Sequence, residues 1–358
     1  MTSNIDIKKL LKEAVDLRCS DIHITVGVPP SVRIFGSLKP MPQYPILTAA
    51  DTENLAQQVL TDAQFNTIAE NGDVDFAIQY TDVGRFRANI FKQRKSYSMV
   101  FRVLASNIPN LESLNLPPVI TTLAQKPRGL ILVTGPTGSG KSTTLAAIID
   151  YINRNRYNHI LTLEDPVEFI HPHKKCVVNQ REVGDDTTSF ARALRGALRE
   201  DPDVILVGEM RDLETISAAV TAAETGHLVL STLHTKGAAS TIDRIIDSFP
   251  AEQQTQIRMQ LVNVLEGVIT QDLVPRADGT GRALAMEILI MNDAVRNLIR
   301  ESKIHQVGQI MQTNLQLGMQ TMDYHLAKLT REGIITVDSG MKKAMDKASY
   351  QRYLNMNI

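Results

Sequence analysis

The sequence has only two cysteines, no long hydrophobic run and almost no net charge. Cys19 and Cys176 lie far apart and in no metal-binding or redox spacing, so we expect a reduced cytosolic protein. No run of about 18 apolar residues occurs, which argues against a membrane-spanning helix, and the start lacks the apolar segment of a signal peptide. A net charge of −1 gives no general attraction to nucleic acid or anionic lipid.

The length of 358 residues predicts about two domains. Up to residue 104 the pattern is that of a small α+β domain. We expect helices over residues 5–17 and 51–70, strands over 21–26 and 31–35, and antiparallel strands over 75–80, 84–91 and 96–104. Residues 105–118 contain three prolines and read as a linker.

From residue 119 to 358 the pattern predicts an α/β domain in which strands and helices alternate. Such alternation implies a largely parallel sheet covered by helices on both faces, with ligands at the carboxyl ends of the strands. We expect strands over 129–134, 159–163, 176–179, 203–207, 227–232 and 283–290, and helices over 119–125, 143–149, 189–199, 213–224 and 252–274. From about residue 291 the chain is expected to be helical, over 293–302, 304–313, 321–331 and 341–347.

A phosphate-binding loop lies between the first strand and the first long helix of this domain. Residues 135–142 fit the pattern G-x-x-x-x-G-K-[ST] at every fixed position. Glycine lets the backbone N–H groups curl around an anion, and the helix N-terminus adds a partial positive charge. Lys141 is expected to reach the β- and γ-phosphates, and the Ser142 hydroxyl to ligate Mg²⁺. The expected nucleotide-binding residues are Gly135, Pro136, Thr137, Gly138, Ser139, Gly140, Lys141, Ser142 and Thr143.

Acidic residues follow two of the predicted strands. Glu164, Asp165 and Glu168 come just after the strand over 159–163, where carboxylates suit Mg²⁺ ligation. The strand over 203–207 is followed by Gly208-Glu209, so the aspartate usual in such ATPases is replaced by glycine. Glu209 is a candidate for orienting or deprotonating the attacking water. The alternative is that Glu209 only caps the next helix.

Histidine and arginine are the remaining candidates for the site. His234 follows the strand over 227–232 and is a candidate γ-phosphate sensor, although a histidine in this position is more often structural. Phosphoryl transfer is accelerated by an arginine that neutralises developing charge, often from another subunit. The small domain offers Arg85, Arg87, Arg94 and Arg102, and the helix over 189–199 offers Arg192, Arg195 and Arg199 on one face. The residues alone do not choose between the two sets.

Taken together, four blocks resemble the secretion ATPases of type II and type IV systems. Residues 135–142, 163–168, 195–209 and 226–235 match, in order, that superfamily's Walker A, Asp box, Walker B and His box. Gly208-Glu209 is typical of the superfamily's Walker B block. Residues 294–301 and 318–323 resemble the C-terminal signatures of its pilus retraction motors.

The resemblance implies a RecA-like P-loop ATPase domain preceded by a PAS-like domain, assembled as a homo-hexamer that uses ATP and Mg²⁺. It implies that Glu209 is the catalytic carboxylate, Glu164 the Asp-box acid and Mg²⁺ ligand, and His234 the His-box histidine. ATP is expected between the two domains, with Arg87 and Arg102 completing the site. The expected partner is a platform protein of the inner membrane, which would hold the cytoplasmic ring at the inner face of that membrane.

The resemblance also points to a direction of work. Pilus extension and type II secretion motors of this superfamily usually carry a four-cysteine zinc module, which two cysteines cannot build. We therefore expect no zinc, and a motor for pilus retraction and twitching motility. The alternatives are an accessory retraction ATPase, which would be a paralogue and possible partner of the main motor, a nucleotide switch that does not hydrolyse, and a RecA-like nucleic-acid translocase. The charge balance disfavours nucleic acid, and the acids Glu164 and Glu209 disfavour the switch.

Overall fold

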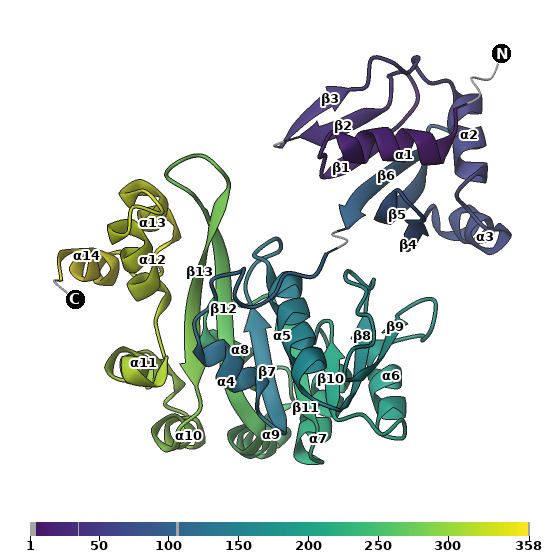
Figure 1. Ribbon diagram of the computed structural model, residues 1–358. Helices are drawn as coiled ribbons and strands as arrows, with labels where there is room; N and C mark the ends of the chain where they lie inside the picture. Colours follow the sequence, from purple (N-terminus) through teal and green to yellow (C-terminus); the bar gives the residue numbers. More distant parts are fainter. Residues whose placement is uncertain (1–4, 35, 105–106, 357–358) are drawn as a thin grey trace. The chain divides into compact units, whose positions relative to one another are not determined.

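The computed structural model describes residues 5–34, 36–104 and 107–356. The chain forms two compact units, one of Met1–Asn107 with Pro166–Ile170 and one of Ile108–Asp165 with His171–Ile358. Figure 1 shows the elements of both units. Phe35 and residues 105–106, which the sequence predictions included, lie outside the described residues. Among the described helices, none is both long and apolar enough to cross a membrane.

The first unit is an antiparallel six-stranded sheet with three helices, as expected of a small α+β domain. The strand order is β3-β2-β1-β6-β5-β4. Asp6 starts the first helix by accepting hydrogen bonds from the amides of Lys8 and Lys9. The elements are α1 (Ile7–Asp16), β1 (Asp21–Ile24), β2 (Ser31–Ile34), β3 (Ser37–Pro40), α2 (Ala49–Gln57), α3 (Asp62–Asn71), β4 (Asp73–Tyr80), β5 (Gly84–Gln93) and β6 (Ser96–Leu104).

One prediction for this unit was wrong in detail, and one strand was not predicted. The single helix over 51–70 is two helices, because Thr61 forms a capping box with Gln64 and starts α3 anew. The turn expected at Gly36-Ser37 is followed by the exposed edge strand β3, which sequence reasoning missed. Its four residues are all exposed, so β3 carries no hydrophobic alternation that could have revealed it.

The second unit contains a seven-stranded sheet in the order β13-β12-β7-β11-β10-β8-β9. All neighbours are parallel except β12 and β13, which form an antiparallel pair. Every residue of β7, β10 and β11 is buried, which explains their unbroken apolar runs. The elements up to the sheet's last strand are α4 (Val119–Ala124), β7 (Gly129–Thr134), α5 (Lys141–Asn155), β8 (His159–Glu164), β9 (Val177–Glu182), α6 (Phe190–Ala197), β10 (Val204–Val207), α7 (Leu213–Glu224), β11 (Leu228–Leu233), α8 (Ala238–Asp247), α9 (Ala251–Val264), β12 (Leu265–Pro275) and β13 (Arg282–Ile290).

Helices cover both faces of this sheet, as the alternating pattern predicted. Alternate strand residues point to opposite faces. Leu130 and Leu132 pack in one core with α6 to α9 and with α10 (Asp293–Arg300). Ile131 and Val133 pack in another core with α4 and α5. The result is the layered α/β architecture of a RecA-like P-loop domain.

The long helix predicted over 252–274 was wrong. Helix α9 ends at Val264, and the chain continues directly into β12, which pairs with β7 and β13. Proline and glycine are absent between residues 251 and 266, so the sequence carries no break signal there. The pairing of β12 with two neighbours overrides the helical pattern. Helix α8 was not predicted either.

A helical region follows the sheet, as predicted from about residue 291. Figure 1 shows α12 to α14 beside the β12–β13 hairpin, and their apolar side chains form a core with Val274, Ala283 and Ala285 of these strands. The helix expected over 341–347 is instead two helices, α13 and α14, separated by Ala344–Asp346. The elements are α10 (Asp293–Arg300), η1 (Ile304–Gln306), α11 (Val307–Thr313), η2 (Leu315–Leu317), α12 (Met322–Arg331), α13 (Val337–Lys343) and α14 (Lys347–Asn355).

Candidate active site

Four neighbouring parallel strands end at the same edge of the large sheet. Strands β7, β11, β10 and β8 are hydrogen-bonded in this order, and Thr134 of β7 pairs with Leu233 of β11. The phosphate loop therefore begins next to His234. Val207 of β10 pairs with Leu163 of β8. Glu164 is the last residue of β8, and Glu209 follows the end of β10, so the two glutamates lie at neighbouring strand ends. The sequence prediction that these groups come from the carboxyl edge of one sheet is confirmed.

The phosphate loop has the backbone that its glycines require. Gly138 and Gly140 have φ values of 78° and 91°, a left-handed conformation that favours glycine, and no atom lies within 4 Å of where their Cβ atoms would be. At Gly135, with φ of 136°, a Cβ would lie 2.2 Å from the carbonyl oxygen of Gln271, which leaves no room for a side chain.

The polar groups of the loop fit a polyphosphate. The ammonium of buried Lys141 donates to the carbonyl oxygens of Gly135 (2.9 Å) and Pro136 (3.1 Å) and thus lies within the curl of the loop. Among the described residues, the buried Ser139 hydroxyl has no hydrogen-bond partner. Helix α5 starts at Lys141, so its free N–H groups and partial positive charge point into the same loop.

Strand β12, whose residues the sequence prediction had assigned to a helix, supports the phosphate loop. Gln271 donates from Nε2 to Oγ1 of Thr144 at 2.8 Å, and the hydroxyls of Thr134 and Thr270 are 2.8 Å apart. All four of these side chains are buried. Gln271 is therefore a supporting residue of the site, and only a correct strand prediction for 265–275 could have found it.

Glu209 lies in a polar cluster at the end of β10 and does not cap the following helix. Its carboxylate is 2.8 Å from Nε of Arg211 and 3.2 Å from Nε2 of His234, and 18% of its side chain is exposed. Asp212 caps α7 instead, because it accepts the amide hydrogen of Thr215 at 2.8 Å. The capping alternative for Glu209 is thereby excluded.

The glycine in front of Glu209 has a steric reason. A Cβ on Gly208 would lie 3.2 Å from the carbonyl oxygen of Leu163 and 3.4 Å from Cα of Glu164. The amide of Gly208 also donates to that carbonyl at 2.7 Å, so the two chains approach closely here. An aspartate at this position would push β8 and β10 apart.

Glu164 is the last residue of β8, and its carboxylate is held in place. One oxygen accepts from Thr162 Oγ1 at 2.7 Å and from Gln180 Nε2 at 3.2 Å. A carboxylate and the hydroxyl of Ser142 are the hard oxygen ligands that Mg²⁺ prefers, and this ion usually takes only one or two protein ligands beside phosphate and water. Among the described residues, no group of three or more acidic, histidine or cysteine side chains is arranged so that it could hold a metal ion.

His234 follows β11 and is 43% exposed at its side chain. The strand before it is tied to β10, since Ser231 donates to the carbonyl of Val207 (2.8 Å) and Thr232 to that of Gly208 (2.6 Å). These buried hydroxyls hold the ends of β10 and β11 in register. This register places the two strand ends from which Glu209 and His234 follow beside each other.

Arg87 and Arg102 belong to the first unit and lie directly opposite each other on β5 and β6. Directly opposed residues share one face of a sheet. Each is ion-paired within the unit, Arg87 to Asp75 (Nε to Oδ2, 3.0 Å) and Arg102 to Asp21 (2.9 Å). The Arg102 side chain is nevertheless 64% exposed. The first unit thus offers two adjacent guanidinium groups on one sheet face.

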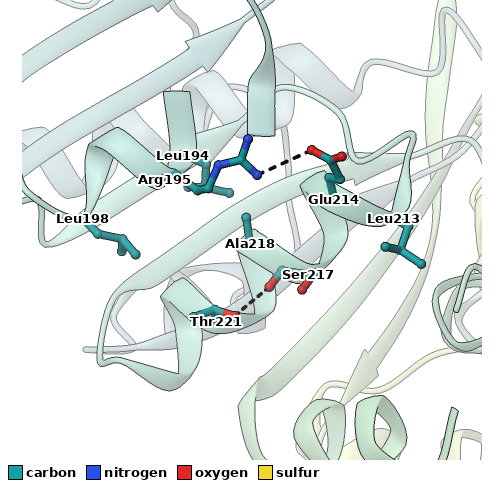
Figure 2. A pocket seen from close by; sticks show the side chains of 8 residues that line it. All are labelled: Leu194, Arg195, Leu198, Leu213, Glu214, Ser217, Ala218 and Thr221. Atoms are coloured by element: carbon teal, nitrogen blue, oxygen red, sulfur yellow. Dashed lines mark hydrogen bonds and ion pairs between the residues drawn. The ribbon is translucent and has the colours of Figure 1, made fainter. Parts of the chain in front are cut away.

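The competing arginines of the second unit lie elsewhere. Helix α6 ends at Ala197, so Arg199 does not share its face with Arg192 and Arg195 as predicted. Figure 2 shows Arg195 pointing across a shallow groove of about 300 Å³ between α6 and α7 toward Glu214. The 3.5 Å ion pair is solvent-exposed on both sides, which is typical of a surface contact.

A pocket of about 380 Å³ adjoins the phosphate loop. It is bounded by Ser139, Gly140 and the first turn of α5, and on its far side by β12, β13 and α12. His325 lines it and accepts the amide hydrogen of Met286 at Nδ1 (2.9 Å), so the ring proton is on Nε2. Burial lowers the pKa of His325 to about 4. The apolar lining is Leu114, Leu273, Leu284, Leu329 and Ile334. Sequence reasoning found no signal for this pocket.

Comparison with known proteins assigns the chain to a family. The model of the family described as type II/IV secretion system protein matches residues 3–342. The chain belongs to this family. The resemblance found in the sequence blocks is therefore confirmed over nearly the whole chain.

Within the secretion family, the chain is similar to pilus motors. It is 48% identical over 340 residues to the type IV pilus retraction ATPase PilT of Pseudomonas aeruginosa, covering 95% of this chain and 98% of that one. It is 49% identical to a twitching motility protein of Neisseria gonorrhoeae, covering 93% and 90%, and 43% identical to the type IV pilus ATPase PilU of P. aeruginosa, covering 95% and 89%. A crystal structure of the pilus retraction motor PilT with bound ADP superposes with a TM-score of 0.92 at 52% identity, covering 98% of this chain and 100% of that one.

Proposed function

We propose that this secretion-family protein is an ATPase that powers retraction of type IV pili. The observation that carries the proposal is the match to a retraction motor with bound ADP, which spans 98% of this chain at a TM-score of 0.92. The cluster of Glu209 and His234 beside a phosphate loop supports hydrolysis over simple nucleotide binding.

We infer a task for each group at the sheet edge from its position. The loop amides, Lys141 and the N-terminus of α5 bind the phosphates and stabilise the charge that develops on them. Glu209 takes the proton of the attacking water or orients that water, and His234 contacts Glu209 and the γ-phosphate. Mg²⁺, held by Ser142 and Glu164, would neutralise phosphate charge.

The pocket beside the loop is suited to the base of ATP. It opens next to Ser139, Gly140 and Thr143, and its lining combines apolar side chains with polar ones that include Arg276, Arg282 and His325. We infer that the Nε2–H of His325 donates to a ring nitrogen of the base. We infer that β12, β13 and α12 form the base-binding wall.

We further propose that the site is completed in a homo-hexamer by Arg87 and Arg102 of a neighbouring subunit. Their common sheet face gives two positive groups of the kind that neutralise a transferring phosphoryl group. The ring would work in the cytoplasm against a platform protein of the inner membrane. The existence of a PilU paralogue at 43% identity makes an accessory ATPase a second possible partner.

The catalytic assignment is tested by Glu209→Gln, which keeps the shape of the side chain and removes its basicity. ATP turnover should fall by about a hundredfold or more, while binding of a fluorescent ATP analogue is retained. Glu252→Gln, at an exposed position of α9, is the matched control and should leave both unchanged. Wild-type turnover in Glu209→Gln would remove Glu209 as the base.

The biological role is separated from its alternatives in two steps. A strain that lacks this chain should stop retracting pili and twitching; residual retraction at near-normal force would favour an accessory role. ATP turnover with and without single-stranded DNA addresses the translocase alternative, and strong stimulation by DNA would favour it.

A further inference from the structure

Glu287 of β13 is a buried carboxylate that lies between the N-termini of two helices. One oxygen accepts the amide hydrogen of Ala238, the first residue of α8, at 2.7 Å. The other accepts that of Met322, the first residue of α12, at 3.4 Å. Burial raises the pKa of Glu287, and the two amide donors act in the opposite direction. The two helix N-termini stabilise the negative charge that burial disfavours.

On one side, Glu287 takes the place of a missing helix cap. Helix α8 is preceded by Gly237, which has no side chain to cap it, and no other side chain of its own segment does so. The loop His234–Gly237 runs directly from the histidine beside Glu209 to this helix start. A Cβ on Gly237 would lie 3.5 Å from Glu287 Oε1 and 3.2 Å from Cε of Met345, so the loop end is enclosed by β13 and the C-terminal region.

On the other side, Glu287 contacts the motif over residues 318–323 through the amide of Met322. Gln320 forms two backbone hydrogen bonds with Ile288, and its side chain donates to the carbonyl of Met286 at 2.9 Å. Asp323 accepts the amide hydrogens of Met345 (2.7 Å) and Asp346 (3.0 Å). The motif therefore contacts β13 at the residues before and after Glu287. Through Asp323 it also connects β13 to the segment that leads into α14.

We propose that Glu287 is a positioning residue for hydrolysis, which ties the loop of His234 to the start of α12 and so lets the C-terminal helices set the position of His234. The inference rests on the proposed ATPase function. It gives the motif over 318–323 a mechanical task, namely to hold the carboxylate that caps α8. Glu287 acts through His234 and touches no substrate.

The test compares Glu287→Gln and Glu287→Ala with the wild-type chain in steady-state ATP turnover. Because Glu287 holds the loop of His234, kcat should fall by about tenfold or more in Glu287→Ala, whereas KM should change less, through the start of α12 that borders the pocket. Glutamine keeps one acceptor for the amide of Ala238 and should restore part of kcat. Glu266→Gln, a half-buried carboxylate of β12 paired with Lys126 at 2.8 Å, is the control and should leave kcat unchanged.

The outcomes separate this inference from the proposed function. If the wild-type chain hydrolyses ATP and both Glu287 variants match its kcat, the positioning role is wrong although the ATPase stands. A rise of KM at unchanged kcat would also overturn it. If Glu287→Ala does not fold, the kcat of Glu287→Gln decides alone, and a wild-type value contradicts the inference. No turnover by the wild-type chain would refute the ATPase itself.

Discussion

Gly208 lies at a position where the backbone of β8 comes close to the backbone that follows β10. Where many P-loop ATPases have an aspartate, this chain has a glycine, because a Cβ would lie 3.2 Å from the backbone of β8. The acid that remains, Glu209, is held by Arg211 and His234. The segment that follows β10 therefore offers the site one carboxylate, that of Glu209.

We expect Gly208→Asp to lower the free energy of unfolding by about 1–3 kcal/mol, because the added atoms must push two central strands apart. Urea denaturation measures the change. Gly308→Asp, where no atom lies within 4 Å of the Cβ position, is the control and should cost much less. If Gly208→Asp is as stable as the control, the steric account of this glycine is wrong.

His325 predicts a pH dependence of stability. Its pKa is about 4 in the folded chain and near 6.5 when exposed, since burial disfavours the charged ring. Between these two pKa values the folded state thus binds fewer protons than the unfolded state. The contribution of neutral His325 to the free energy of unfolding is therefore complete above pH 6.5 and is lost as the pH falls toward 4.

From pH 7 to pH 5 this one group should remove about 2 kcal/mol from the free energy of unfolding. We expect His325→Gln to make the loss between these pH values smaller by that amount, as measured by urea denaturation at both. His305→Gln, at an exposed position, should behave like the wild type. Equal pH dependence in His325→Gln and wild type would contradict the assignment.

At the scale of elements, local sequence signals predicted most of the fold, and tertiary pairing decided the rest. The phosphate loop, its flanking strand and helix, and the strand ends with Glu164, Glu209 and His234 follow from apolar runs and glycine spacing. Strand β12 does not, because its residues continue the pattern of α9 and only the pairing with β7 and β13 makes them a strand. Its misassignment hid Gln271 and, with Leu273, one side of the pocket beside the phosphate loop.

The segment over 294–301, which resembles a signature of retraction motors, has a structural task in this chain. It forms helix α10, whose Val295 and Ile299 are fully buried in the core against α9 and α11. Arg296 donates to the carbonyl of Val262. Deleting the segment would therefore remove part of the core as well as any surface that a partner reads.

Ile299→Ala should lower the free energy of unfolding by about 2–4 kcal/mol through the cavity that it leaves. Arg300→Ala, the exposed neighbour, should change it by less than about 0.5 kcal/mol. Thermal and urea denaturation of both variants check this. If the two changes are similar, α10 is not packed as described, and the signature can be interpreted as a surface motif.

At the scale of the whole molecule, the groups proposed for the site belong to two compact units. Lys141, Glu164, Glu209 and His234 belong to the second unit, whereas Arg87 and Arg102 belong to the first. If a neighbouring subunit supplies the arginines, hydrolysis in one subunit depends on the placement of the next. This dependence would let a ring convert ATP turnover into movement.

The most direct test measures ATP turnover in mixtures of two inactive variants, Glu209→Gln and the double variant Arg87→Ala, Arg102→Ala. In a mixed ring, a subunit with an intact Glu209 can lie beside a neighbour with intact arginines. Mixing should therefore restore the ATP turnover that neither variant shows alone. Glu209→Gln mixed with Lys141→Ala is the control and should stay inactive, because both changes affect the same unit of the site. Failure of the first mixture to regain activity, with mixed rings verified by mass spectrometry, would contradict a site shared between subunits.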